Sequence, residues 1–234
     1  MEVVDLTLSM YEGMPNSPMH PRGPVLLSGT LQHRTTRRWM GEDPEHGPVS
    51  FCNEQIVLSG HTGTHLDAPL HAAVDGGDAD SIELSSCIGP ATVLDVRGAA
   101  TTAKIIPLSA LVKALGKQRE LASIVLLHTG WTKILFTDPT QYYRDSVGID
   151  DDAASWLRSS GVRCVGIDAP SIDAPSAPGA RAHMRFLRES PPVYIIENLC
   201  RLDLVPEEIP FFAAAPLPLV GSSGSPVRAF AVLD

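Results

Sequence analysis

Short runs of valine, isoleucine and leucine recur along the chain, and each is bounded by glycine, proline, aspartate or serine. Runs of this length and composition predict β-strands. The expected strands are Val3–Leu8, Gln55–Leu58, Thr92–Val96, Ser123–His128, Cys164–Ile167, Val193–Ile196 and Arg228–Leu233. Because amphipathic segments lie between these runs, the pattern predicts an α/β domain.

Two of the amphipathic segments carry helix start and stop signals. One begins at Pro107, a residue suited to a first helical turn, and ends at Gly116. The other begins near Asp150, continues with acidic residues that the helix dipole favours, and ends at Gly161. A third helix is expected at Ala180–Glu189 on weaker signals.

No linker or internal repeat divides the sequence, so we expect one domain over residues 1–234. The proline-rich stretches 14–24 and 169–178 are too short to be domain linkers, and we expect ordered loops there. Loops whose ends are held by a rigid sheet often carry function.

Composition narrows the classes of partner. A chain of 234 residues with 44% hydrophobic and 19% charged residues is ordinary for a globular protein. A formal net charge of -9 argues against nucleic acid and anionic membranes as partners, because both need a basic surface. The N-terminus lacks a basic region followed by an apolar run, and no apolar stretch is long enough to cross a bilayer, so we expect neither a secretory leader nor a membrane span. The scattered cysteines lead us to expect free thiols in a reducing cytoplasm. These cysteines are Cys52, Cys87, Cys164 and Cys200.

Potential metal ligands crowd into the segment Gly60–His71, which follows an expected strand. His61, His65, Asp67 and His71 lie within eleven residues, and imidazole with carboxylate suits zinc, iron or manganese. The spacing of His61 and His65 would place both on one face of a helix, but the glycines and the proline favour a turn. A single histidine is usually a packing or surface residue. Four candidate ligands in one short turn are harder to explain that way.

The segment from His61 to His71 resembles the HxGTHxDxPxH signature of the cyclase family of metal-dependent hydrolases. That family includes bacterial kynurenine formamidase and isatin hydrolase. Further stretches along nearly the whole chain are similar to the family pattern, namely Asp5–Ser9, Leu127–Trp131, Val165–Asp173, Ile195–Leu199 and Pro216–Arg228.

The resemblance implies a fold and a set of roles. The fold is a single α/β domain of the swivelling β/β/α type, with a mixed, barrel-like sheet and helices packed outside. Members are usually homodimers or higher homo-oligomers. The implied metal ligands are His61, His65 and Asp67, with His183 and Glu197 completing the site or holding a second ion. His71 matches the histidine assigned as general acid/base.

Apart from the resemblance, the sequence supports a metal-binding role for Glu197 better than for His183. Glu197 ends the apolar run Val193–Ile196, where an unpaired buried carboxylate would be costly, so a metal or a surface position must explain it. His183 lies in a basic, helix-like segment, and apart from the resemblance it would be interpreted as part of a solvated face.

Such a centre indicates hydrolysis by metal-activated water, since a divalent cation lowers the pKa of bound water to roughly 7. A histidine such as His71 can protonate a leaving nitrogen. No Gly-x-Ser-x-Gly elbow supports a serine nucleophile. The expected enzyme uses one or two zinc or manganese ions to cleave a non-peptide amide such as N-formylkynurenine or isatin. A cyclase, a lactone or imide hydrolase, and a catalytically silent metal-binding protein are the alternatives.

Three further features bear on the substrate. Trp39, which follows two arginines, and Trp131 are candidates for aromatic walls of a substrate pocket, although packing in the core explains Trp131 equally well. His128 stands where the family usually has a basic residue before Thr-Gly-Trp, and we interpret it as structural. Extra sequence around 33–48, relative to typical kynurenine formamidases, keeps cyclic amides such as isatin in contention.

Overall fold

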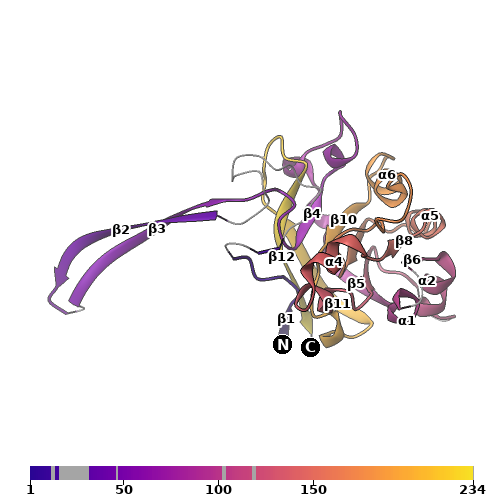
Figure 1. The fold of residues 1–234 in the computed structure, drawn as a ribbon, viewed down its shortest axis with the longest axis horizontal. Coiled ribbons are helices and arrows are strands. Elements are labelled where there is room, and N and C mark those ends of the chain that lie inside the picture. The colour runs from indigo at the N-terminus through magenta and orange to yellow at the C-terminus, as the bar shows by residue number, and fades with distance from the viewer. Residues whose placement is uncertain (12–13, 16–31, 46, 102–103, 118–119, 234) are drawn as a thin grey trace.

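A sheet that closes on itself organises the protein. In the described part of the chain, eight strands form one sheet: β1 (Glu2–Asp5), β12 (Gly224–Leu233), β11 (Glu208–Pro216), β5 (Ile88–Asp95), β7 (Ile124–His128), β9 (Cys164–Ile167), β10 (Tyr194–Glu197) and β4 (His65–Asp67). Because β4 also pairs with β12, seven of these strands close into a barrel, with β1 added beside β12 (Figure 1). The computed structural model describes residues 1–11, 14–15, 32–45, 47–101, 104–117 and 120–233, with backbone only for 32–43 and 47–55.

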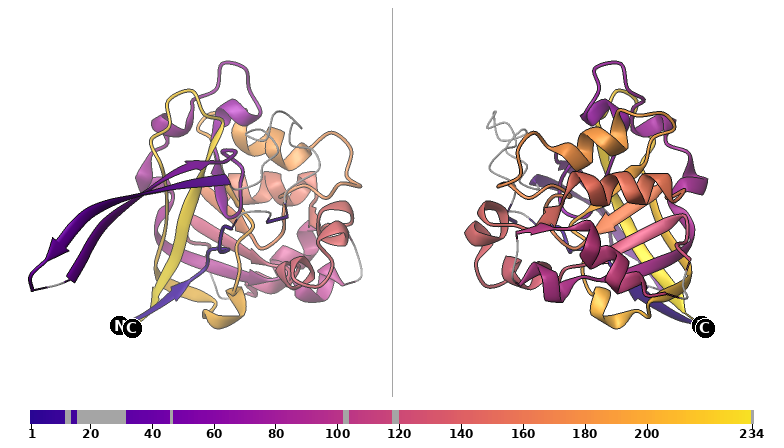
Figure 2. Two further views of the ribbon diagram at one scale, coloured as in Figure 1. Left: turned by 60° about the vertical axis from the view of Figure 1, so that its left-hand side comes forward. Right: turned by 90° about the vertical axis from the view of Figure 1, so that its right-hand side faces the viewer.

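Half of the barrel is parallel and half is antiparallel. The neighbours β5, β7, β9 and β10 run parallel, whereas the pairings of β4, β11 and β12 are antiparallel. Parallel neighbours need crossover connections, and helices supply them on the outside of the barrel (Figure 2). These connections contain α1 (Arg97–Ala100), β6 (Ile105–Ile106), α2 (Leu108–Leu115), α3 (Thr132–Leu135), α4 (Pro139–Arg144), β8 (Gly148–Ile149), α5 (Asp151–Ser159) and α6 (Arg181–Leu187).

Two hydrophobic clusters lie on the two faces of the barrel wall. Along β7, Ile124 and Leu126 belong to the cluster inside the barrel, and Val125 and Leu127 belong to the cluster beneath the helices. Successive side chains of a strand point to opposite faces, so a strand buried on both faces needs an unbroken apolar run. Four of the expected apolar runs belong to these parallel strands, β5, β7, β9 and β10.

The predicted fold class is confirmed: the chain is a mixed α/β protein with a seven-stranded barrel and outer helices. Each of the seven expected strands overlaps an observed one, and the three expected helices overlap α2, α5 and α6. Two strands of the barrel were missed. The segment Glu208–Pro216 forms β11, and His65–Asp67 forms β4 where the sequence analysis expected only a turn.

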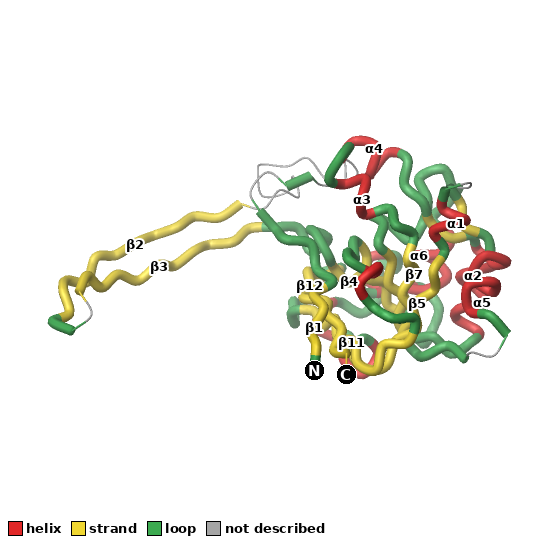
Figure 3. The backbone as a smooth tube through the Cα atoms, turned by 90° about the horizontal axis from the view of Figure 1, so that it is seen from below, coloured by secondary structure: helices red, strands yellow, loops and turns green. Residues whose placement is uncertain are grey.

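No strand was predicted for the stretch around Trp39, and the structure has two there. Residues Gln32–Asp43 form β2 and Gly47–Val57 form β3, and the two pair with each other as one long antiparallel hairpin. The hairpin extends away from the barrel on the side opposite the helices (Figures 1 and 3). The expected strand Gln55–Leu58 is the end of β3.

The remaining expectations concern thiols, loops and membrane segments. Three of the four cysteines, Cys87, Cys164 and Cys200, are buried and free, as predicted, and the side chain of Cys52 lies outside the described residues. The segment 169–178 is a loop, whereas residues 16–24 of the other expected loop lie outside the described residues. Among the described helices, none has the length and apolar character needed to span a membrane.

Candidate metal centre

The pairing of β4 with β10 creates the centre of the site. Glu197 at the end of β10 lies directly opposite His65 at the start of β4. Residues opposite each other in an antiparallel pair share a face of the sheet, and Asp67 joins that face because it is two residues from His65. Leu66 and Ile196 point the other way, into the interior of the barrel. Three polar side chains therefore meet on the outer face of the wall.

Helix α6 brings a fourth side chain over this face. His183 Nε2 lies 3.5 Å from Asp67 Oδ2 and 3.3 Å from Glu197 Oε1. On the other side, His65 Nε2 lies 3.4 Å from Asp67 Oδ1 and 3.5 Å from Glu197 Oε2. Two imidazole nitrogens and two carboxylates therefore surround one small volume, and all four residues are buried.

His61 enters from the turn that precedes β4. Its Nδ1 lies 2.7 Å from Asp67 Oδ1. The ring packs against Gly224 so closely that a Cβ there would lie 2.7 Å from His61 Cε1. The turn then passes through Gly63, whose φ of 62° is a conformation that side chains with a Cβ rarely adopt. Two glycines thus allow the histidine of the turn to approach the strand.

Hydrogen bonds outside this volume orient the side chains around it. His61 Nε2 contacts Ser223 Oγ at 2.9 Å, and His65 Nδ1 contacts the carbonyl oxygen of Gly63 at 2.9 Å. The backbone amide of Ile172 donates to Glu197 Oε1 at 2.8 Å. The outer nitrogen of each imidazole is engaged in this way, so the inner nitrogen is left facing the carboxylates. The outer nitrogen of His183 lies against the carboxylate of Asp173 in the same way.

Asp67 lies at the centre of these contacts. Both of its carboxylate oxygens are buried, and the groups that face them are the imidazoles of His61, His65 and His183, at 2.7, 3.4 and 3.5 Å. A buried carboxylate is costly unless a positive charge balances it, and a metal ion can balance it in place of protonated imidazoles. The histidine and carboxylate donors around it are the ligands that zinc and manganese accept. The residues present therefore fit a divalent cation.

Within the cluster, the imidazoles and the carboxylates stabilise each other's charged forms. Burial alone would lower the pKa of His65, but the carboxylates of Asp67 and Glu197 outweigh it and raise this pKa to about 10. Burial would likewise lower the pKa of His183, and neighbouring carboxylates hold it well above its usual value. The imidazoles in turn bring the pKa of Glu197 to about 2, against the effects of burial and of Asp67. A cation bound among these anionic oxygens would take the place of the imidazole protons.

His71 is the exposed member of the group. It lies in the short 3-10 helix η2 (Pro69–His71), with its ring centroid 4.2 Å from that of His61 and 5.5 Å from that of His183. Partial desolvation and the positive charge of these two neighbours lower its pKa, although Asp67 opposes the shift. His71 can therefore be neutral near pH 7, when it can accept a proton.

Two overlapping groups of ligand atoms have the compactness of a metal site. One is His65, Asp67 and Glu197, and the other is His61, Asp67 and His71, with the atoms of each group within 4.8 Å of one another. Because Asp67 belongs to both groups, the arrangement is compatible with one ion or with two.

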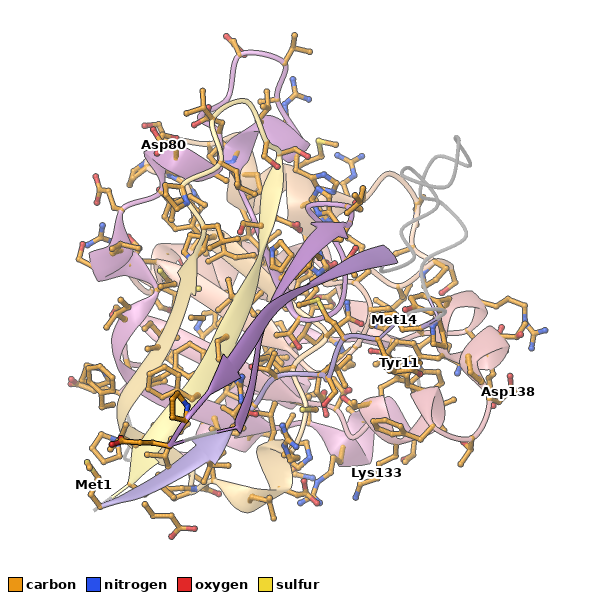
Figure 4. All side chains as sticks on the ribbon, turned by 90° about the vertical axis from the view of Figure 1, so that its left-hand side faces the viewer. Met1, Tyr11, Met14, Asp80, Lys133 and Asp138 are labelled. Atoms are coloured by element: carbon orange, nitrogen blue, oxygen red, sulfur yellow. The ribbon has the colours of Figure 1, made fainter. Side chains whose placement is uncertain are left out.

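Met10 and Met14 cover the turn. A Cβ on Gly63 would lie 3.2 Å from Met10 Cγ and 3.7 Å from Met14 Cε, so both methionines pack against the backbone beside His65. Figure 4 shows Met14 and Tyr11 next to each other on this side of the molecule. An apolar wall therefore borders the histidine cluster.

The structure does not bring every candidate to this cluster. Trp131 donates its indole N–H to the carbonyl oxygen of Tyr142 at 3.0 Å and lies 4.2 Å beneath the ammonium of Lys104, which are the contacts of a packing residue. His128 lies at the end of β7, separated from β10 by β9, and lines a separate cavity of about 160 Å³. Its interpretation as a residue apart from the site agrees with this position. The side chain of Trp39 lies outside the described residues.

Three supporting residues lie in stretches that resemble the family pattern, but the sequence analysis assigned them no role of their own. Ser223 immediately precedes β12, Gly224 begins it, and both contact His61, whereas Asp173 contacts His183. Asp173 stands in the loop after β9 among ordinary proline and serine residues, so no local signal marks it. Its role depends on where α6 packs, which a single sequence does not reveal.

Comparison with known proteins identifies the family. The family model described as "Putative cyclase" matches residues 4–174, most of the chain. The chain belongs to the cyclase family. Among curated members, a kynurenine formamidase of Geobacillus thermodenitrificans is 37% identical over 205 aligned positions, covering 82% of this chain and 88% of the relative. An isatin hydrolase of Roseibium aggregatum is 28% identical, and the alignment covers 100% of this chain and 92% of the relative.

Solved structures of cyclase-family proteins share the fold. An isatin hydrolase bound to the product analogue thioisatinate superposes with a TM-score of 0.76 at 26% identity, covering 99% of this chain and 92% of the other. A potential metal-dependent hydrolase with cyclase activity gives a TM-score of 0.73 at 28% identity, covering 98% and 96%. The chain is thus a cyclase-family hydrolase of the kynurenine formamidase and isatin hydrolase type.

Proposed function

We propose that the protein is a divalent-metal-dependent hydrolase of non-peptide amide bonds, acting on an aryl formamide or a cyclic aryl amide. The observation that carries the proposal is Asp67, whose two buried oxygens face three imidazoles and lie in both compact groups of candidate ligands. One or two zinc or manganese ions per subunit suit this donor set. The relatives support the choice of bond, because both kynurenine formamidases and isatin hydrolases are among them.

The residues divide into two roles. The metal would be held by His61, His65, Asp67, His183 and Glu197. When bound, a divalent cation supplies Lewis acidity, which makes water a better nucleophile and polarises a carbonyl. All of the holding side chains except His61 are buried, and their outer contacts fix their orientation before a substrate arrives.

Proton transfer falls to His71. Amide hydrolysis forms a C–O bond from water and breaks the C–N bond, and the departing nitrogen must gain a proton that water gives up. His71 is exposed beside the cluster, and its lowered pKa makes it neutral near pH 7. A ring nitrogen can therefore accept the proton from water and donate it to the leaving nitrogen.

A small substrate panel tests the proposed bond class. The metal-loaded protein is expected to hydrolyse N-formylkynurenine or isatin with a higher kcat/KM than a cyclic imide or an aryl lactone, and a chelator is expected to abolish the activity. Formate release and ring opening, followed by absorbance, provide the measurement. Cleavage of the lactone alone would make the protein an ester-type hydrolase, and chelator-resistant activity would remove the metal from the proposal.

We also propose that the protein acts as a homodimer or a larger homo-oligomer. The hairpin of β2 and β3 extends away from the barrel, with its backbone paired along its length within the hairpin itself (Figure 3). A two-stranded hairpin has marginal stability when nothing packs against it. In a symmetric homo-oligomer, the hairpin would pack against a second copy of the chain.

Shortening the hairpin is expected to convert the assembly to monomers. Thr36 pairs with Asn53, so replacing residues 37–52 with Asn-Gly would close a short hairpin at that pair. Light scattering at micromolar concentration should give a dimer or larger species for the full-length protein and a monomer for the variant. Cooperative thermal unfolding of the variant is the control for an intact barrel. A monomeric full-length protein would contradict the proposed assembly.

A further inference from the structure

Asp173 holds His183 through an unusually complete set of contacts. Its Oδ2 lies 2.6 Å from His183 Nδ1 and accepts the backbone amide of His183 at 3.0 Å. Its Oδ1 accepts the backbone amide of Ala182 at 2.9 Å. Both carboxylate oxygens are thus used, and the residue is buried. The Asp173 side chain therefore fixes both the first turn of α6 and the imidazole ring of His183.

These contacts determine which nitrogen of His183 is available. A carboxylate accepts a hydrogen bond, so Nδ1 must carry the proton that lies between Asp173 and the ring. Nε2, the nitrogen that faces Asp67 and Glu197, is then the one that can present a lone pair. Rotation of the ring is restricted as well, because the same carboxylate binds the helix backbone.

The loop that carries Asp173 is itself fixed in place. The preceding amide, that of Ile172, donates to Glu197, so two consecutive residues hold the two distal members of the cluster. The loop packs on β8: Ile149 donates its amide to the Ile172 carbonyl oxygen at 2.9 Å, and a Cβ at Gly148 would overlap the backbone of Asp173 and Ala174. Asp173 therefore acts from a rigid support.

We propose that Asp173 is a positioning residue for the metal centre, which fixes the tautomer and orientation of His183 so that Nε2 faces the cation. The inference rests on the proposed function, in which His183 holds metal. It assigns a role to a residue outside the signature segment, supplied by the loop between β9 and α6.

The test is the affinity of the protein for Co²⁺ alone, measured by competition with a chromophoric chelator. In Asp173→Asn, the amide oxygen can still accept from Ala182, but the amide nitrogen can only donate to an unprotonated His183 Nδ1. This favours a proton on Nε2. We expect the affinity for Co²⁺ to fall by about 10–100-fold, and the d–d absorption bands of bound Co²⁺ to shift.

Asp150→Asn is the matched control. Asp150 also accepts a backbone amide at the start of a helix, that of Ala153 at 2.7 Å in α5, but it does not contact the cluster. It should lower thermal stability without changing Co²⁺ affinity. If Asp173→Asn fails to fold, Asp173→Ser keeps a small acceptor that cannot reach the ring, and it should show the same loss of affinity.

A double-mutant cycle separates positioning from general support. If Asp173 acts through His183, adding Asp173→Asn to His183→Ala should cause no further loss of Co²⁺ affinity. An equal loss in both backgrounds, or an Asp173→Asn affinity equal to that of the Asp150→Asn control, would overturn this inference and leave the proposed function standing. Failure of the unmodified protein to bind Co²⁺, Zn²⁺ or Mn²⁺ would overturn both.

Discussion

Asp67→Ala is expected to lose bound divalent metal and hydrolytic activity together. Asp67 is the residue shared by both groups of candidate ligands, and its two buried oxygens face three imidazoles. Metal ions contribute several kcal/mol to such reactions, and each ~1.4 kcal/mol is about tenfold in rate. We therefore expect kcat/KM to fall by about 10³-fold or more, and His61→Ala to act in the same direction.

Elemental analysis and thermal unfolding provide the measurements. Added Zn²⁺ or Mn²⁺ should raise the Tm of the unmodified protein, because the ion binds the folded state, and should leave the Tm of Asp67→Ala unchanged. His128→Ala is the matched control, since His128 is also a buried histidine at a strand end but lies outside the cluster. Full metal content and full activity in Asp67→Ala and His61→Ala would refute the proposed centre.

His71→Ala is expected to keep its metal and lose its rate. His71 is exposed and stands beside His61 and His183, so removing its ring leaves the buried ligand set intact. A positioned general acid/base contributes about 10²–10⁴-fold, and kcat should fall by that factor. The loss should be smaller for substrates with good leaving groups, because these need less protonation as the bond breaks.

Metal stoichiometry measured beside kcat, for one poor and one good leaving group, distinguishes the roles open to His71. Parallel loss of metal and activity would make it a ligand, as its place in the second compact group allows. If the variant keeps its metal and its full rate on the substrate with the poor leaving group, His71 is neither a metal ligand nor the general acid/base. His128→Ala again serves as the control, with metal and rate both retained.

The sequence was most informative where chemistry and local pattern coincide. The segment His61–His71 could be interpreted because ligand types, glycines and a proline are concentrated in it, and β7 and β9 because strands buried on both faces are continuously apolar. Both features are local in the chain. The barrel as such was an implication of the family resemblance, since apolar runs do not say which strands pair.

The rest depends on contacts between distant segments. The strand β4 has three residues and an ordinary local pattern, and it exists because β10 and β12 supply its hydrogen bonds. The same pairing puts Glu197 opposite His65, a relation between residues more than a hundred positions apart. His183 and Asp173 likewise meet only because the loop after β9 folds back on α6. A single sequence contains no direct record of such pairings.

The position of β4 in the barrel has a thermodynamic consequence. This three-residue strand completes the closure between β10 and β12, and it also supplies His65 and Asp67. A cation held by these two residues with Glu197 would join adjacent strands across that closure, while His183 would tie α6 to the same point. Cation binding and closure of the barrel at β4 are then linked equilibria. Binding of the cation stabilises the closed barrel, and stabilisation of the closed barrel raises the affinity for the cation by the same free energy.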